Sequence, residues 1–171
     1  MKRLLFISFV FSLFQLIVFS ACNSTDSNDS ESAYVDLGLS VKWATANVGA
    51  DAPEGYGDFY TYDEAVSKFG NNLPTEEQFQ ELQNNCTWKW TTHKGADGYK
   101  VTGPNGKSIF LPAAGNRSCE GDVNFVGTSG FYWSSTPYEP DFATFLCFYS
   151  TEVSMNTNYR CYRFSVRLVR N

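Results

Sequence analysis

The sequence predicts an α+β domain in which mixed, mostly antiparallel strands form the sheets and two short helices pack on one side. Aromatic and β-branched residues are dense in residues 130–136, 145–150 and 164–170, which is typical of strands. An Asn-Gly dipeptide at Asn105-Gly106 lies between two apolar runs and indicates a hairpin. The chain has 171 residues, which is enough for one domain with a substantial core.

Residues 1–21 are expected to be a targeting signal and not part of the fold. Lys2 and Arg3 precede an apolar run over residues 4–19, and two small residues stand before Cys22. This pattern resembles a bacterial lipoprotein signal, which is cleaved before the cysteine so that Cys22 carries lipid on its thiol and amine. The membrane is therefore an expected partner. The alternative is an uncleaved membrane anchor, for which the apolar run is short.

Residues 22–33 are expected to be the lipidated cysteine and a disordered acidic tether, and the folded domain is expected to span residues 34–171. Residues 23–32 contain no apolar side chain, so they cannot bury surface in a core. Their acidic residues resemble the export signal that sends lipoproteins to the cell surface in the Bacteroides group. We therefore expect a lipid-anchored protein of the outer membrane that is exposed at the cell surface.

The charge balance argues against a nucleic-acid partner. Removal of Lys2 and Arg3 with the signal lowers the basic count from 13 to 11, against 18 acidic residues. No basic patch stands out, and binding to a phosphate backbone requires one. We interpret the excess of acidic residues as a solvated surface.

The N-terminal part of the domain is expected to contain two short strands followed by a helix. Val35, Leu37 and Leu39 would share one face of the first strand, and residues 41–44 would form the second. Residues 61–69 have the pattern of a short helix, which Gly70 and the two asparagines after it would end. The residues of this helix that are expected to face inward are Ala65, Val66 and Phe69.

The clearest local signal is a helix that begins after Thr75. Thr75 is a favourable N-cap, and Gln78 three residues later completes a capping box. Phe79 and Leu82 lie on one side of this helix and should pack on a sheet. A hairpin over residues 99–111 and a polar, glycine-containing loop over residues 116–129 are expected to follow.

The last two strands differ in their pattern. In residues 164–169 the even-numbered side chains would point one way and the odd-numbered side chains the other. Residues 145–149 carry apolar side chains on both faces. That strand is therefore either buried on both sides or exposed as a binding surface on one of them.

Five motifs occur in an order that is specific to one family. They are residues 36–44 (DLGLSVKWA), 73–76 (LPTE), 109–115 (IFLPAAG), 132–135 (YWSS) and 165–170 (SVRLVR). Together they resemble the Fibrobacter succinogenes major paralogous domain, which is common in secreted and surface proteins of Bacteroidetes. The resemblance implies a C-type lectin-like fold related to the formylglycine-generating and sulfatase-modifying enzymes.

The four cysteines that follow Cys22 favour neither a metal site nor catalysis. Cys86, Cys119, Cys147 and Cys161 are not spaced as in a zinc site, and in an exported protein they can oxidise in any of three full pairings. Formylglycine-generating enzymes hold copper with a close cysteine pair, which Cys147 and Cys161 do not match in sequence. We therefore expect no catalytic residue and no cofactor, and the alternative is an enzyme of the sulfatase-modifying kind.

Two other features carry weaker signals. Glu139 and Asp141 flank Pro140 in a tripeptide that resembles the calcium-binding motif of sugar-binding C-type lectins. The Trp-Asn-Asp motif that accompanies it in those lectins does not follow, so the two carboxylates are only weak metal candidates. His93, the single histidine, is expected in a surface turn.

The C-terminal strands carry the candidate ligand-binding residues, because aromatic, Ser, Cys, Asn and Thr side chains are mixed there as in adaptable recognition surfaces. This mixture resembles the variable region of surface lipoproteins and phage receptor-binding proteins that retroelements diversify. Leu146 and Phe148 would point inward, and Cys147 and Tyr149 outward. The candidates are Phe142, Thr144, Phe145, Cys147, Tyr149, Ser154, Asn156, Asn158 and Tyr162.

The expected function is therefore a surface-displayed lipoprotein that recognises a protein or glycan ligand through its C-terminal face. The alternative from another class is a structural domain of the cell envelope without a ligand. That alternative predicts that the face formed by residues 142–162 is buried.

Overall fold

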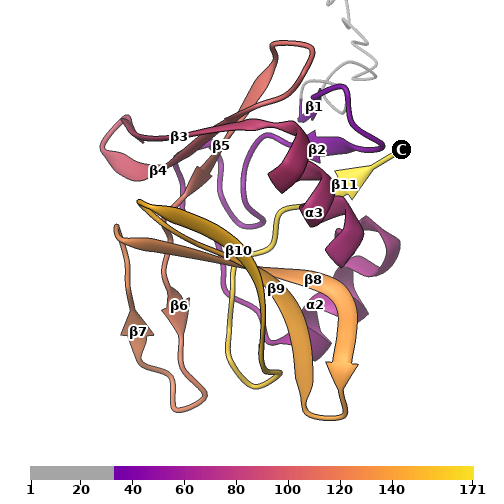
Figure 1. Ribbon diagram of the computed structural model, residues 1–171. Helices are drawn as coiled ribbons and strands as arrows, with labels where there is room; N and C mark the ends of the chain where they lie inside the picture. The colour runs from indigo at the N-terminus through magenta and orange to yellow at the C-terminus, as the bar shows by residue number, and fades with distance from the viewer. Residues whose placement is uncertain (1–32) are drawn as a thin grey trace, which may run out of the picture.

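The computed structural model of the protein describes residues 33–171, and the predicted lipidation site at Cys22 lies outside the described residues. The described part is an α+β structure with short helices and antiparallel sheets, which confirms the predicted class (Figure 1). Two isolated parallel bridges, Gly115 with Gly130 and Tyr132 with Ser165, make the pairing mixed. No helix within residues 33–171 is both long and apolar enough to span a membrane.

The two ends of the domain lie side by side, because the C-terminal strand β11 pairs with β2 near the N-terminal end (Figure 1). The helices are α2 (Tyr62–Phe69), the 3₁₀ helix η1 (Gly70–Asn72) and α3 (Glu76–Asn85). The strands are β1 (Tyr34–Asp36), β2 (Lys42–Ala44), β3 (Thr87–His93), β4 (Ala96–Thr102), β5 (Ser108–Pro112), β6 (Asn116–Arg117), β7 (Val123–Asn124), β8 (Ser129–Glu139), β9 (Phe142–Tyr149), β10 (Glu152–Tyr159) and β11 (Val169–Arg170). The sheets have the orders β1-β2-β11, β3-β4-β5, β6-β7 and β10-β9-β8.

Both predicted helices are present, and each begins with a capping box. In α3, Thr75 accepts a hydrogen bond from the Gln78 backbone N–H, and the Gln78 side chain accepts one from the Thr75 N–H, as predicted. Thr61 and Glu64 form the same arrangement in α2. The expected inward position of Val66 is wrong, since 37% of this residue is exposed. The buried stripe of α2 runs instead through Tyr62 and Ala65, and Val66 lies beside it.

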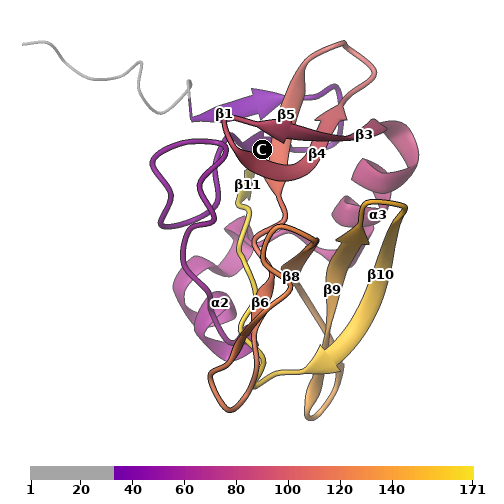
Figure 2. The same ribbon diagram turned by 90° about the vertical axis from the view of Figure 1, so that its left-hand side faces the viewer.

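The β8–β9–β10 sheet divides the interior into two apolar clusters. Leu146 and Phe148 on one face of β9 pack with Phe79 and Leu82 of α3. The opposite face contributes Phe145 and other residues to a second cluster that includes Tyr62 and Ala65 of α2. The two helices therefore lie on opposite sides of this sheet, as Figure 2 shows, and the expectation that they pack on one side is wrong. The reason is that both faces of β9 are apolar and each needs a cover.

The segment over residues 164–169 alternates as predicted, but both of its faces are buried. Phe164 and Val166 belong to the second cluster, while Val169 belongs to the first. Arg167, on the same face as Val169, is 0% exposed. Its guanidinium donates to Asn47 Oδ1 at 3.0 Å and to the carbonyl oxygens of Ala44 at 3.0 Å and Phe110 at 2.9 Å. A buried guanidinium thus ties the C-terminal segment to β2 and β5, which is why a polar residue on this face is not a sign of exposure.

Candidate functional site

One face of the β8–β9–β10 sheet collects most of the candidate residues that remain accessible. In the β9–β10 ladder, Ser154, Asn156 and Asn158 stand opposite the odd-numbered residues of β9. Residues directly opposite each other point to the same face, so these side chains share a face with Tyr149. Tyr149 is 46% exposed, Asn156 is exposed, and Ser154 and Asn158 are half-buried. We call Tyr149, Ser154, Asn156 and Asn158 the C-terminal face.

Four of the other candidates lie elsewhere or beneath the surface. Phe145 is 5% exposed and Cys147 is 4% exposed, so the expectation that Cys147 points outward is wrong. Both residues are on the central strand of three, where the second apolar cluster covers them. Thr144, also buried, points to the opposite face, where its hydroxyl forms a hydrogen bond with that of Ser134. Phe142 shares that opposite face and packs on Tyr159, with ring centroids 4.3 Å apart.

Tyr162, the ninth candidate, is half-buried at the edge of the second cluster. Its ring centroid lies 6.0 Å from that of Phe164. Tyr162 therefore contributes to packing and keeps part of its surface accessible.

A phenylalanine in the segment that the sequence predicts to be a polar loop, Phe125, extends this site. Phe125 is 57% exposed and has a positive φ of 62°, which is rare for a bulky side chain. Its carbonyl oxygen accepts hydrogen bonds from the backbone N–H groups of Thr128 and Ser129, each at 3.1 Å, and from the Thr128 hydroxyl at 3.0 Å. Three donors on one carbonyl hold the backbone in this conformation and present the ring to solvent.

Phe125 and Tyr149 flank the same buried ring. The Phe131 centroid lies 6.0 Å from that of Phe125 and 6.5 Å from that of Tyr149. The C-terminal face thus continues into an aromatic end formed by these two exposed rings. Val123 and Val126, at 50% and 45% exposure, stand beside Phe125 in the sequence. Three apolar residues within residues 123–126 of a glycine-containing loop are the sequence signal that could have identified this end.

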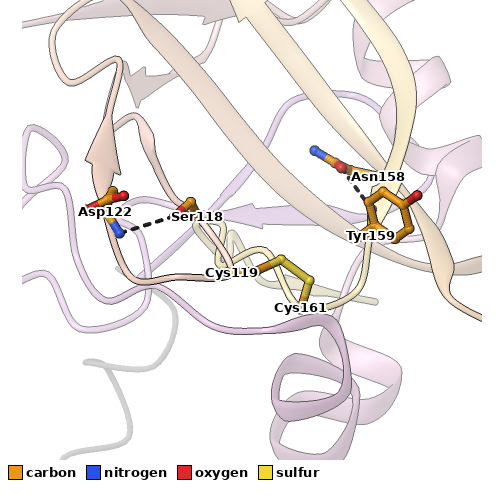
Figure 3. Close-up of a disulfide and its surroundings, with 6 residues drawn as sticks. All are labelled: Ser118, Cys119, Asp122, Asn158, Tyr159 and Cys161. Carbon is orange, nitrogen blue, oxygen red and sulfur yellow. Dashed lines mark hydrogen bonds between the residues drawn. A yellow bond between two sulfur atoms is a disulfide. The ribbon is translucent and has the colours of Figure 1, made fainter.

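The other end of the C-terminal face is fixed by a disulfide between Cys119 and Cys161, whose Cα atoms are 5.1 Å apart (Figure 3). It joins the β6–β7 connection to the segment that follows β10. Next to it, Arg117 and Arg163 exchange two backbone hydrogen bonds of 2.9 Å. Asn158 Oδ1 accepts a hydrogen bond of 2.8 Å from the Tyr159 N–H, which orients this amide at the end of β10 (Figure 3).

The disulfide belongs to one of the three full pairings that the sequence left open, but that pairing is not completed. Cys86 and Cys147 are free thiols, so Cys119–Cys161 is the single disulfide within residues 33–171. Burial raises the pKa of both thiols, and at neutral pH they remain protonated. Neither free cysteine has the environment of a reactive thiolate, and Cys161 cannot form a thiolate pair with Cys147 while it is oxidised.

The weak metal candidates lie at the tip of the β8–β9 hairpin. Glu139 and Asp141 are both exposed there. The Asp141 carbonyl oxygen accepts a hydrogen bond of 2.9 Å from the Arg160 N–H, which joins this tip to the end of β10. Within the part of the chain that the structure describes, no group of three His, Cys, Asp or Glu side chains could hold a metal ion. Two solvated carboxylates alone are a poor match for the six to eight oxygen ligands of calcium.

The comparison with known proteins supplies a family and no relative of known activity. No curated protein and no solved structure matches the chain. A family model described as "Domain of unknown function (DUF8237)" matches residues 75–169, a range that runs from the cap of α3 to β11 and contains the whole C-terminal face. Because this match covers more than half of the 171 residues, the protein belongs to the DUF8237 family.

Proposed function

We propose that the protein is a lipid-anchored binding module of the cell surface, which recognises a protein or glycan ligand through the C-terminal face and its aromatic end. The observation that carries this proposal is Phe125. A large apolar side chain is held in a sparsely populated backbone conformation and still presented to water, 6.0 Å from the ring of Phe131. Folding gains little from an exposed ring of this kind, whereas binding can gain much.

The composition of the face suits recognition. Tyrosine supplies a large contact area with few rotatable bonds, and Ser and Asn side chains supply adaptable hydrogen bonds. Here Tyr149 and Phe125 are the aromatic anchors, while Ser154, Asn156 and Asn158 supply polar groups on the same sheet. Asn156 Nδ2 donates to Ser154 Oγ at 2.9 Å, so this pair is ordered before a ligand arrives. A face ordered in advance loses less entropy on binding.

The architecture of the protein supports a C-type lectin-like fold of the major paralogous type as part of the same proposal. The five ordered motifs fall on structurally distinct positions: the first spans β2, LPTE leads into α3, and YWSS lies within β8. The motif IFLPAAG covers the end of β5, and SVRLVR includes the buried Arg167 and β11. The motifs thus coincide with the parts of the chain that hold the domain together. Anchoring through Cys22 and export to the outer surface remain proposals based on the N-terminal sequence.

A structural envelope domain without a ligand is the second candidate, and one observation favours it. Thr144, Phe145 and Cys147, which would have been the centre of a variable surface, are buried. If the remaining exposed residues serve only solubility, the C-terminal face has no ligand. For an enzyme of the sulfatase-modifying kind the cysteine chemistry offers no support, because Cys161 is oxidised and the buried thiols stay protonated.

The experiment that tests the proposal compares three aromatic truncations in the full-length protein. Phe125→Ala and Tyr149→Ala remove the anchors, and Tyr138→Ala, 62% exposed at the β8–β9 tip, is the matched control. Binding is measured on a glycan array and on a display library of bacterial and host surface proteins. Loss of an anchor should weaken binding by about 2 kcal/mol, which is roughly 30-fold in Kd.

The control decides between the two candidate functions. Tyr138→Ala should bind as the wild type does, and all three variants should keep the wild-type unfolding midpoint. If no ligand is retained in either format, or if only Tyr138→Ala loses binding, the C-terminal face is not the binding site and the structural candidate is preferred.

A further inference from the structure

A hollow lies away from the C-terminal face, on the outer side of the β3–β4–β5 sheet. It has a volume of about 290 Å³ and lies between this sheet and the loop that follows β2, with Pro53 at its border. In Figure 2 this sheet stands above the β8–β9–β10 sheet, and the loop after β2 runs on the same side as α2. The hollow is close in size to the smallest pockets that hold drug-like ligands, and it suits a compact molecule.

The ladder registers place the lining side chains on one face. Lys100 stands opposite Lys89 of β3 and opposite Phe110 of β5. Because opposed residues share a face and alternate residues follow them, Thr91 and Ser108 point to the same side as Lys100. The inner face of this sheet carries Tyr99, Val101 and other core residues, so the outer face is free to form a site.

Two lysines on this face form no salt bridge within residues 33–171, and one of them, Lys100, lines the hollow. Lys89 and Lys100 are directly opposed, an arrangement of like charges that destabilises a sheet, and neither forms a salt bridge with any residue in 33–171. The nearby carboxylate of Glu54 pairs with Lys94 through Oε1 at 3.2 Å, and its Oε2 lies 3.8 Å from His93 Nε2, so it pairs with neither Lys89 nor Lys100. In a protein with an excess of acidic residues, the unpaired Lys100 in the lining of this hollow favours an anion there.

The other groups that line the hollow indicate what the uncharged part of that anion should look like. The Phe110 ring forms the apolar floor, and the His93 ring stands beside it with centroids 5.3 Å apart. The hydroxyls of Thr91 and Ser108 line the hollow and make no hydrogen bond with other residues of the described chain. The site therefore offers a flat apolar surface, two hydroxyls and one ammonium within a small volume.

We propose that this hollow binds an acidic sugar of the hexuronate class. Its carboxylate lies at Lys100, the apolar side of its ring packs on Phe110, and its hydroxyls bond to Thr91 and Ser108. A single ammonium with hydroxyls suits a carboxylate on a polyhydroxylated ring better than a phosphate or sulfate, for which several converging donors or an arginine fork are usual. The site shares no residue with the C-terminal face, so it does not depend on the function proposed there.

The test titrates the full-length protein with D-glucuronate and D-galacturonate and follows binding by calorimetry and by NMR of the amides in β4 and β5. D-Glucose, which lacks the carboxylate, and sodium sulfate, which lacks the ring, are the probes for comparison. A hexuronate should bind at least ~10-fold more tightly than glucose, which lacks the carboxylate for Lys100, and than sulfate, which lacks the ring that packs on Phe110.

Variants locate the site. Lys100→Gln should weaken hexuronate binding by ~10-fold or more, and Thr91→Val should weaken it less. Lys68→Gln, a change of the same charge on α2, should leave it unchanged, and Glu54→Gln should not weaken it because a nearby negative charge is removed. Equal affinity for glucose and hexuronate, equal affinity for sulfate, or full binding by a folded Lys100→Gln variant would each overturn the proposal.

Discussion

β9 and β10 are neighbouring strands of eight residues each, yet they have opposite roles. Residues 143–148 of β9 are buried without interruption, whereas β10 has no buried residue. Their positions explain the difference, since β9 lies between β8 and β10 and β10 lies at the edge of the sheet. The pair Phe145 and Asn156 makes the point directly. They stand opposite each other on one face, and only Phe145 is covered by the second cluster.

The composition of β10 is consistent with an edge strand that must stay soluble. Polar Ser154, Asn156 and Asn158 occupy its outer face, and polar residues on an edge discourage pairing with another chain. Gln83 of α3 donates to the Val153 carbonyl oxygen at 2.8 Å and so covers part of the edge backbone. An exposed edge strand such as β10 therefore needs both polarity and a partial cover, and the central strand β9 needs neither.

The largest expected effect is on the buried member of the opposed pair. Phe145→Ala should lower the free energy of unfolding by about 3–5 kcal/mol, because a ring packed on Phe131, Trp133 and Phe164 is lost. Asn156→Ala should change it by less than about 0.5 kcal/mol. Urea unfolding of both variants measures the difference, and equal losses would mean that the two strands are not distinguished by burial.

Removal of the disulfide should have the second-largest effect on the free energy of unfolding. The disulfide holds the segment that follows β10, and neither of its cysteines lies in β9. The double variant Cys119→Ser/Cys161→Ser opens a crosslink between residues 42 positions apart, and loop-closure entropy predicts a loss of about 4 kcal/mol. Cys86→Ser replaces a cysteine that forms no disulfide within residues 33–171. It is the control, and it should leave the free energy of unfolding nearly unchanged. Denaturation under non-reducing conditions compares them. A wild-type midpoint in the double variant would show that the clamp does not stabilise the fold.

A pH effect should separate the buried side of the sheet from its exposed edge. Tyr132 of β8 is 0% exposed, and burial raises its pKa from 10 to about 12. The protonated phenol therefore contributes stability that is present below pH 10 and is lost as the pH rises through 12, up to about 2–3 kcal/mol.

Tyr132→Phe is the variant that isolates this effect. Between pH 10 and 12 the stability of the wild type should fall more steeply than that of Tyr132→Phe, while below pH 9 the two curves should run parallel. Their offset there reflects the lost hydrogen bond of 2.7 Å from the Tyr132 hydroxyl to the Pro112 carbonyl oxygen. Urea midpoints at each pH provide the measurement, and parallel curves over the whole range would contradict the assignment.

The smallest expected effect is on the helix that covers one side of β9. Thr75→Ala removes the α3 cap and should cost about 1 kcal/mol of unfolding free energy. Thr157→Ala, an exposed threonine of β10, should stay within about 0.5 kcal/mol. Thermal melts of both variants show whether the cap matters, and an unchanged Thr75→Ala midpoint would argue against a stabilising capping box.

Local chemistry made several elements predictable. The capping box at Thr75, the hairpin at Asn105-Gly106 and the alternation of residues 164–169 depend on side chains within a few positions of one another. The outcome for the candidate site was divided, because alternation indicates which residues share a face but not what covers that face. Tyr149 and Asn156 are exposed as the face requires, whereas Phe145 and Cys147 are not.

The sequence by itself determined the class of the fold, the starts of the helices, the turns and the two-sided apolar character of β9. Only the tertiary structure decided that β9 is the central strand and β10 an edge strand, that Cys119 pairs with Cys161, and that α2 and α3 lie on opposite faces of the β8–β9–β10 sheet. It also decided that Arg167 is buried and Phe125 is not. These outcomes join segments up to 123 residues apart, as in the bond from Arg167 to the Ala44 carbonyl oxygen. Such contacts depend on how distant elements pack around a shared core, which no local sequence pattern specifies.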